Sequence, residues 1–298
     1  MSALLLLLVC LALGVLVARF AAPPADMARG INWWVINIAL PALVLRLIPQ
    51  THFEPQLWFL VASMWLVFGG SWLLFGWLGR RLGWGRSRTG AMVLVCGLGA
   101  TSFIGFPMIE ALRGAPGLQY AIIADQLGCY TALAAGGIAV TAVYAGHRVL
   151  PSHVVRRILA SPPIWALAGG VAVGLLGPMP AAPAYVLERL GQSMGPLALF
   201  SVGLQFRLHA ARGQLGLVAL GLGWKMALAP LACYLLAVAT GVGGLVLATG
   251  VLQAAAAPMV SGVILAQQYE LEPPLAASLL GAGILVSLLW LPLLNLAL

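Results

Sequence analysis

Two short stretches decide how this chain folds: Gly105-Phe106-Pro107-Met108 and Ala256-Ala257-Pro258-Met259. Each places a Pro-Met pair well inside a long apolar run. Because proline lacks a backbone N–H and clashes with the preceding turn, each helix is expected to break or kink there. One such proline is usually a packing kink. Two at matching positions in the two halves of a chain are typical of the binding sites of secondary transporters.

The composition around these stretches is that of a helical membrane protein. Of the 298 residues, 62% are hydrophobic and only 7% are charged, against about 25% charged residues in a soluble domain. Charges this sparse cannot cover a soluble surface, and the hydrophobicity excludes disorder. The apolar runs are continuous rather than alternating, which excludes a β-barrel. We therefore expect an all-α polytopic membrane protein.

The apolar runs and the breaks between them predict ten transmembrane helices, because a spanning helix needs about 20 residues. The breaks contain turn residues or charges, such as Pro23-Pro24 and Gly114-Ala115-Pro116. The predicted helices are 2–21, 31–49, 56–79, 89–112, 117–145, 163–180, 184–206, 213–236, 243–267 and 274–297.

The distribution of basic residues predicts the orientation of these helices. Odd-numbered connections hold 11 Lys and Arg residues and even-numbered ones hold 3, while Lys225 lies inside a helix. The positive-inside rule then places the odd connections in the cytoplasm and both termini outside it. A basic cytoplasmic linker over 148–162 separates a first repeat (1–147) from a second (163–298). Five helices in each half make the second repeat inverted relative to the first.

Two ionisable residues deep inside the predicted spans are candidates for coupling. Asp125 lies in the fifth helix and Lys225 in the eighth, where an isolated charge is expensive. Asp125 is a candidate for proton coupling or cation binding, with a structural hydrogen bond as the alternative. Lys225 could pair with Asp125, attract an anion or stabilise the bundle. Glu110, one turn after Pro107, is closer to the outer interface.

Uncharged polar residues cluster near the two expected breaks. A broken helix exposes N–H groups that bind a carboxylate and carbonyls that bind a cation. Asn37 on the second helix either lines the same cavity or joins helices. The candidate substrate-binding residues are Thr101, Ser102, Gly105, Pro107, Gln253, Pro258, Ser261 and Asn37.

Other chemistries have no support in the sequence. It contains no zinc-protease, nucleophile-elbow or phosphate-loop motif, and the four cysteines lie in apolar runs without a CxxC pair. The scattered basic residues form no patch for nucleic acid. We expect no enzyme activity, no cofactor and no metal.

The chain resembles the auxin efflux carrier family, a branch of the bile acid/sodium symporter-like transporters. The resemblance covers essentially the whole chain and depends on the order of several motifs. These are Asn37 to Pro41, the run from Gly99 to Pro107, the run from Gly195 to Gly203, Lys225 before Pro230, Pro258 with Ala266, and Ser287 to Pro292.

This resemblance implies a scaffold domain and a transport domain, each formed from both repeats. It implies that helices 4 and 9 unwind and cross, here at Pro107 and Pro258, and that the core moves in an elevator-like manner. It also implies organic-anion substrates, such as auxin-like or malonate-like carboxylates, and homodimers. Many relatives carry an asparagine where this chain has Ala100. The substrate or ion contacts that the asparagine makes in those relatives are therefore not expected in this chain.

The leading hypothesis is therefore a secondary transporter of small organic anions in a bacterial inner membrane. Coupling to protons is preferred over coupling to sodium, because a single buried carboxylate supplies too few oxygen ligands for a sodium ion. The alternatives are a sodium-coupled symporter of the bile-acid type and a membrane sensor or scaffold that does not transport.

Overall fold

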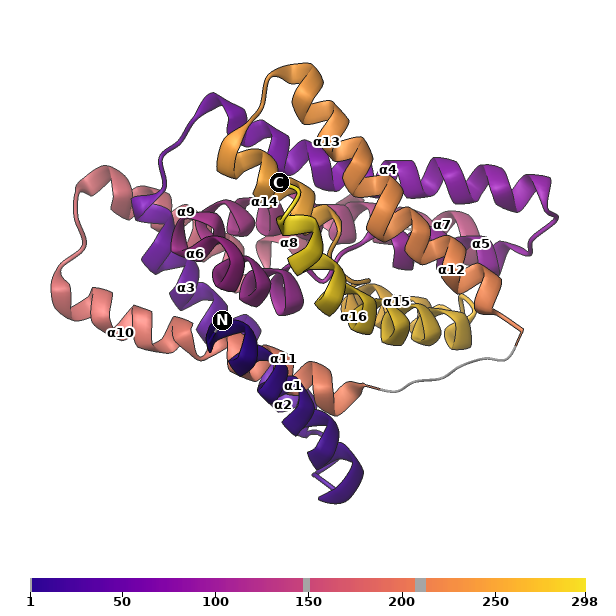
Figure 1. The fold of residues 1–298 in the computed structure, drawn as a ribbon, viewed down its shortest axis with the longest axis horizontal. Helices are drawn as coiled ribbons and strands as arrows, with labels where there is room; N and C mark the ends of the chain where they lie inside the picture. The colour runs from indigo at the N-terminus through magenta and orange to yellow at the C-terminus, as the bar shows by residue number, and fades with distance from the viewer. Residues whose placement is uncertain (1, 147–150, 207–212) are drawn as a thin grey trace. The chain divides into compact units, whose positions relative to one another are not determined.

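The computed structural model describes residues 2–146, 151–206 and 213–298, and within them every regular element is helical (Figure 1). The α-helices are α1 (Ser2–Phe20), α2 (Met27–Trp34), α3 (Leu40–Leu47), α4 (Trp58–Arg81), α5 (Arg86–Gly97), α6 (Phe106–Ile123), α7 (Ile138–Ala145), α8 (Pro151–Leu159), α9 (Pro162–Leu176), α10 (Ala181–Gln192), α11 (Met194–Gln205), α12 (Leu215–Gly223), α13 (Ala229–Thr240), α14 (Gly244–Ala254), α15 (Val260–Gln268) and α16 (Pro273–Asn295).

Wider π-helical turns and short 3-10 turns join several of these helices. The π-helical turns are η1 (Val35–Ala39), η4 (Thr101–Gly105), η5 (Ala124–Cys129), η6 (Ala132–Gly137) and η7 (Trp224–Leu228). The 3-10 turns are η2 (Ile48–Gln50) and η3 (Pro55–Leu57). Because π-helical turns occur frequently at functional sites, the side chains that they carry are of particular interest.

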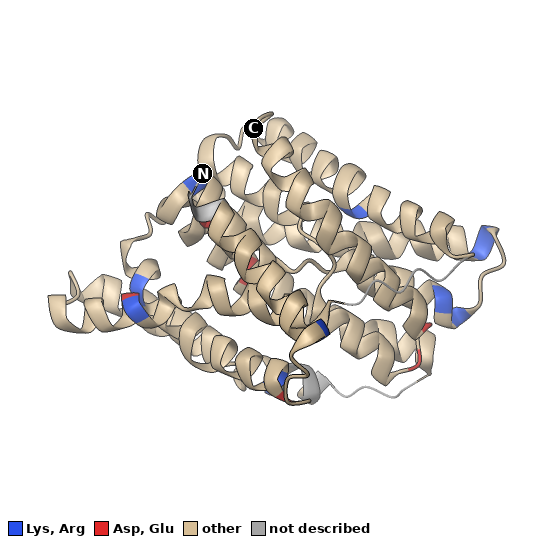
Figure 2. Cartoon of the chain, turned by 60° about the horizontal axis from the view of Figure 1, so that its bottom comes forward, with Lys and Arg blue, Asp and Glu red and all other residues tan. Residues whose placement is uncertain are grey.

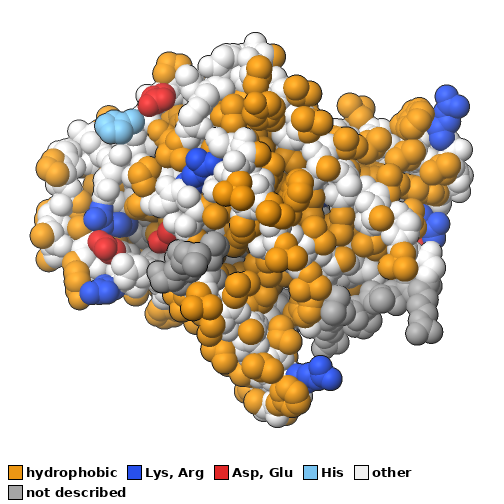
Figure 3. Space-filling view, in the orientation of Figure 1, with side chains coloured by type: hydrophobic (Ala, Val, Ile, Leu, Met, Phe, Trp, Pro, Cys, Tyr) orange, Lys and Arg blue, Asp and Glu red, His pale blue; other side chains and the backbone are white. Residues whose placement is uncertain are grey.

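Among the residues that the structure describes, five helical stretches are long and apolar enough to cross a membrane. They are Met27–Gln50, Pro55–Arg81, Thr101–Ala145, Leu215–Thr240 and Pro273–Asn295, and Leu5–Phe20, Pro162–Leu176 and Gly244–Ala254 are shorter apolar helices. Hydrophobic side chains cover much of the visible surface (Figure 3), and Leu175 and Leu176 are 84% and 89% exposed. Most charged positions lie at or near helix ends (Figure 2). The apolar exterior therefore suits a lipid environment rather than water.

Helices occupy all ten predicted ranges, but several bounds differ from the prediction. The helix expected over 163–180 ends at Leu176, because Gly177 adopts a φ of 119° and prolines follow it. The helix expected over 184–206 begins at Ala181 and is interrupted between α10 and α11. The break expected at residues 114–116 is present, since Gly114 bends α6 with a φ of 69°.

The expected linker over 148–162 is described only from residue 151 onward. It contains the helix α8 where a loop was expected. Three arginines that contribute to the charge count, Arg148, Arg207 and Arg212, lie outside the described residues. The orientation and the inverted repeat stay predictions.

The chain divides into two compact units, and each unit takes segments from both halves of the sequence. The first unit comprises Met1–Glu54, Ser102–Ile122 and Ile158–Phe206. The second comprises Pro55–Thr101, Ile123–Arg157 and Arg207–Leu298. The boundaries cut through the helical stretch Thr101–Ala145, so a contiguous run of helix contributes to both units.

In the first unit, α1 packs closely against α11 because two glycines face each other. A methyl group at Gly14 would lie 2.2 Å from the carbonyl oxygen of Phe200, and one at Gly203 would lie 2.3 Å from that of Leu11. Small residues let membrane helices approach until their backbones touch. This contact joins the first helix of the chain to a helix from its second half.

Polar contacts join the other helices of the first unit. Arg46 of α3 forms an ion pair with Glu188 of α10 at 3.4 Å. The hydroxyl group of Ser201 in α11 donates to the side-chain oxygen of Asn32 in α2 at 2.5 Å. Both contacts connect the first half of the sequence to the second.

The α1–α11 contact predicts that Gly203→Ala destabilises the protein by about 1–3 kcal/mol, because the new methyl group overlaps the α1 backbone. The matched control is Gly30→Ala in α2, where a methyl group would meet nothing within 4 Å. Thermal unfolding in detergent should show a lower Tm for Gly203→Ala and an unchanged or higher one for Gly30→Ala. Equal Tm values for the two variants would contradict this packing.

Candidate functional site

Two interrupted helices of the second unit meet through their extended segments. After α5, residues 98–100 leave the helical conformation, and residues 255–259 separate α14 from α15. Gly99 and Pro258 form an isolated antiparallel bridge. The N–H of Ala100 donates to the carbonyl of Ala257 at 2.7 Å, and that of Met259 donates to the carbonyl of Leu98 at 3.1 Å. We call residues 98–100 and 257–259 the crossing.

The first interruption lies before Pro107, not at it. Pro107 is the second residue of α6 and follows the π-helical turn η4. Because η4 and α6 belong to one continuous helical stretch, Thr101–Ala145, Pro107 lies inside a helix, directly after the wider π-helical turn. Pro258, in contrast, lies in the crossing itself. The expectation that Pro107 marks the crossover is therefore wrong by several residues, and Gly99 holds that position.

Pro258 reaches this position because α16 carries a glycine beneath it. A methyl group at Gly283 would lie 2.3 Å from Cδ of Pro258 and 3.3 Å from Cδ2 of Leu222. The prolyl ring therefore rests directly on the α16 backbone. This contact fixes how closely the second extended segment approaches α16.

Asp125 is buried beside the crossing and is held by two side-chain donors. It lies in the π-helical turn η5 and is 2% exposed. The hydroxyl group of Thr101 donates to its Oδ1 atom, and Nε2 of Gln126 donates to its Oδ2 atom at 2.6 Å. Hydrogen bonds to a carboxylate are stronger than those between neutral groups. Thr101 directly follows Ala100, so Asp125 is linked to the crossing by one residue.

Lys225 is also buried beside the crossing, on another π-helical turn. It lies in η7 and is 1% exposed. Its ammonium group donates to the carbonyl oxygen of Ala254 at 2.9 Å. Ala254 is the last residue of α14, so Lys225 binds the negative end of that helix dipole. A methyl group on Gly99 would lie 3.0 Å from Nζ of Lys225, so the ammonium group also lies against the crossing.

Gln253 differs from these residues because its polar atoms have no partner. Its side chain is 0% exposed, and neither Oε1 nor Nε2 forms a hydrogen bond. Thr249, one turn earlier on α14, is equally buried, and its hydroxyl group has no hydrogen-bond partner. The Oε1 atom of Gln126 is also buried without a partner. Buried polar groups in native proteins almost always have partners. Unpartnered atoms beside an interrupted helix indicate a place where a ligand or water binds.

The structure brings together only part of the predicted set. Thr101, Asp125, Lys225, Gln253, Pro258 and Ser261 belong to the second unit, and Ser261 is the second residue of α15. Asn37, Ser102, Gly105 and Pro107 belong to the first unit. Asn37 donates to the carbonyl of Trp33 in its own helix at 2.8 Å. The candidate site as the structure describes it is therefore the second-unit set.

Sequence reasoning missed several contributors to this site. Gly99, Gln126 and Cys129 lie within one or two turns of residues that were identified, and the thiol of Cys129 donates to the carbonyl of Gly99 at 3.2 Å. Thr249 had a detectable signal, because it precedes Gln253 by four residues on an apolar helix and so shares its face. The part of the chain that the structure describes holds no cluster of three or more His, Cys, Asp or Glu residues suited to a metal.

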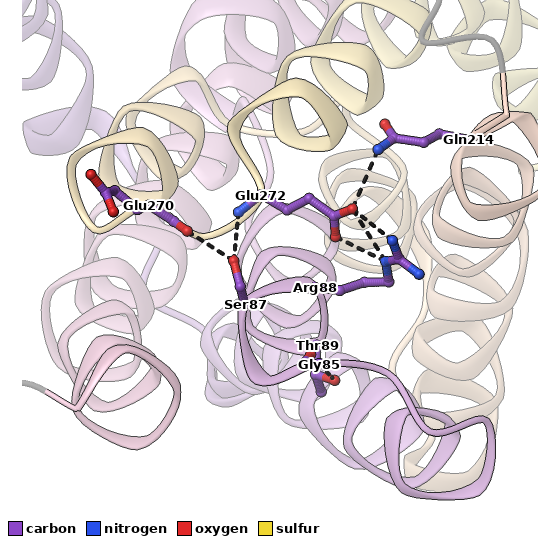
Figure 4. Close-up of polar contacts among 7 residues, drawn as sticks. All are labelled: Gly85, Ser87, Arg88, Thr89, Gln214, Glu270 and Glu272. Carbon is purple, nitrogen blue, oxygen red and sulfur yellow. Dashed lines mark hydrogen bonds and ion pairs between the residues drawn. The ribbon is translucent and has the colours of Figure 1, made fainter.

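A second polar cluster surrounds the first turn of α5 (Figure 4). By the rise of the helix, it lies about 15 Å from the crossing. Arg88 binds the carboxylate of Glu272 through Nε and Nη2 at 2.9–3.2 Å. Gln214 donates to the same carboxylate at 3.3 Å, and the hydroxyl group of Ser87 accepts the N–H of Glu272. Glu272 raises the pKa of the Arg88 guanidinium by hydrogen bonding and by its charge.

This cluster anchors the turn between α15 and α16. Glu270 and Glu272 have positive φ angles of 53° and 41°, a strained conformation for residues other than glycine. The hydroxyl group of Ser87 donates to the carbonyl of Glu270 at 2.8 Å. Since α5 and α15 both lead to the crossing, the cluster sets the relative position of the two interrupted helices.

Comparison with known proteins shows the family to which the chain is similar and a related protein. A sequence model of the family described as membrane transport protein matches residues 1–149 and residues 145–295. A protein of Methanothermobacter thermautotrophicus described as an uncharacterized transporter is 23% identical over 206 residues. The aligned region covers 69% of this chain and 67% of that protein.

The contact beneath Pro258 predicts that Gly283→Ala lowers the stability of the protein by about 1–3 kcal/mol, because a rigid prolyl ring cannot yield to the new methyl group. Gly69→Ala in α4 is the control in the same unit, since a methyl group there meets nothing within 4 Å. Thermal unfolding in detergent measures both variants. An unchanged Tm for Gly283→Ala would show that the crossing does not rest on α16.

Proposed function

Because this chain belongs to the membrane transport protein family, that of the auxin efflux carriers, we propose that it carries small organic anions across the membrane as a secondary transporter. Members of this family are transporters, not enzymes. The observation that carries the proposal is Gln253, whose fully buried side chain has no partner beside two crossing, interrupted helices. A substrate that supplies both a donor and an acceptor would satisfy it.

The charge of the surroundings supports an anionic substrate. The helix α15 begins directly after the crossing with Val260, Ser261 and Gly262. The first N–H groups of a helix lack intrahelical partners and carry partial positive charge, so they bind carboxylates. The hydroxyl group of Ser261 adds a further donor at this end. Mono- and dicarboxylates are the substrate class that fits these donors.

Asp125 supports coupling to protons. An ionised carboxylate only accepts hydrogen bonds, whereas a protonated one also donates. Protonation of Asp125 would therefore alter its bonds from Thr101 and Gln126. Because Thr101 adjoins Ala100, whose N–H bonds to Ala257 in the crossing, this change would reach the proposed substrate site directly.

The two compact units support an elevator-type mechanism, in which the unit that holds the crossing moves as a body. Each unit draws segments from both halves of the chain, as such a mechanism requires of a scaffold and a transport domain. The excess of basic residues in odd-numbered connections supports a bacterial inner-membrane location with both termini outside the cytoplasm.

The proposed substrate site is tested by Gln253→Leu. The variant removes two unsatisfied polar atoms, so its Tm should stay equal to that of the wild type or rise, while transport should fall by at least about tenfold, as expected when one buried polar contact to a substrate is lost. The assay is substrate-dependent current, together with counterflow, in vesicles with mono- and dicarboxylates at two pH values. A lower Tm with unchanged transport would show that Gln253 is structural.

Absence of both current and counterflow in the wild type would contradict the organic-anion assignment. It would favour a membrane sensor or scaffold, provided that the reconstituted protein has the same Tm as in detergent. Counterflow is included because electroneutral exchange gives no current.

The proposed coupling is tested by Asp125→Asn, which keeps the shape of the side chain and removes its titration. Transport by the wild type should change with pH, and transport by Asp125→Asn should not. Thr101→Val serves as the companion variant, because it removes a donor to Asp125 but leaves the carboxylate able to titrate. Its pH profile is expected to shift rather than disappear. A pH dependence that survives in Asp125→Asn would rule out the proposed proton role.

A further inference from the structure

The position of Lys225 beside the crossing suggests a specific role for its charge. An interrupted helix leaves its last carbonyl oxygens without intrahelical partners, and transporters of this general design use such carbonyls to bind a coupling cation. In this chain the carbonyl of Ala254, at the end of α14, already accepts a hydrogen bond from the ammonium group of Lys225 at 2.9 Å.

Two further features make this position suitable for an ammonium group. A side chain at Gly99 would crowd Nζ of Lys225, so the absence of a side chain makes room for the ammonium group. The π-helical turn η7 widens the helix at the lysine.

A tethered ammonium group can do the work of a bound ion at this place. It carries one positive charge, as sodium does, and its three N–H donors match carbonyl oxygens. Since it is part of the chain, its effective concentration at the site far exceeds that of a free ion. It also cannot dissociate from the protein as a free ion does.

We propose that Lys225 is the resident cation of the crossing and takes the place that an exchangeable sodium ion would occupy. This inference rests on the proposed function, because it explains how the transporter operates without sodium. The site would then be pre-organised, with the ammonium group holding the end of α14 and leaving Gln253 and Thr249 to the substrate.

The experiment compares Tm in detergent for the wild type, Lys225→Ala and Lys225→Met, without any substrate. Each protein is extracted in methylammonium chloride and exchanged into N-methylglucamine, sodium or methylammonium chloride at constant ionic strength. The Tm of the wild type should change by less than about 1 °C among these cations, because no cation binds at the occupied site. Lys225→Ala should unfold earlier in N-methylglucamine and regain about 3 °C or more in saturating sodium or methylammonium.

Lys225→Met is the matched control, because it fills most of the space of the lysine without its charge. It should also unfold earlier than the wild type, but sodium and methylammonium should not restore its Tm. This pattern separates a missing charge from a missing volume.

Four results would overturn the proposal. They are saturable stabilisation of the wild type by sodium, wild-type stability of Lys225→Met, loss of stability in Lys225→Ala that no cation restores, and failure to extract folded Lys225→Ala even in methylammonium. None of these readouts involves flux. A failure here is therefore distinct from a failure of the organic-anion assignment, which only the transport assays test.

Discussion

The structure depends on the mutual hydrogen bonding of two interrupted helices. A helix that stops inside a membrane exposes backbone groups that lipid cannot satisfy, and each unsatisfied group costs several kcal/mol. Here each extended segment supplies a donor to the other, from Ala100 to Ala257 and from Met259 to Leu98. Gly283 lets the prolyl ring of Pro258 rest on the α16 backbone, and Gly99 leaves room for the ammonium group of Lys225. The two interruptions therefore depend on each other, because each extended segment satisfies backbone groups of the other.

The polar groups around the crossing fall into two classes. Asp125 and Lys225 are buried ionisable residues with partners at hydrogen-bonding distance, as buried polar groups require. Gln253 and Thr249 lie in the same unit and lack partners. The first class sets the local electrostatics in the absence of substrate. The second class leaves donors and acceptors to be satisfied by a molecule from outside, which is the property that a transport site needs.

The two ends of α5 have different structural roles. At one end the helix opens into the crossing, and at the other Arg88 holds Glu272 in the strained turn that precedes α16. The polar atoms of that turn are largely satisfied by Ser87, Arg88 and Gln214. Strain at the turn and the bidentate ion pair offset each other there, so this cluster has the character of an anchor rather than of a binding site.

Hydrophobicity and periodicity are local properties, so the sequence alone was sufficient to predict their structural consequences. It predicted a helical membrane protein, helices in all ten ranges, an interruption at Pro258, and the burial of Asp125 and Lys225. The Pro-Met pair at Pro107 likewise predicted a second interruption in the fourth helix. The resemblance to the auxin efflux carriers, a family confirmed by the match over nearly the whole chain, added that the two interrupted helices cross.

The position of that second interruption, and the identity of the polar residues that have partners, emerged only from the tertiary structure. Pro107 is an obvious helix breaker, yet it lies within a continuous helical stretch after a π-helical turn. Gly99 forms the crossing instead, because the extended segment at Pro258 forms hydrogen bonds with the neighbours of Gly99. Likewise, Gln253 and Lys225 are both polar residues in apolar helices, and sequence does not distinguish the unpartnered one from the partnered one. The hydrogen bonds of the crossing join residues that are distant along the chain, and local sequence carries no record of such pairs.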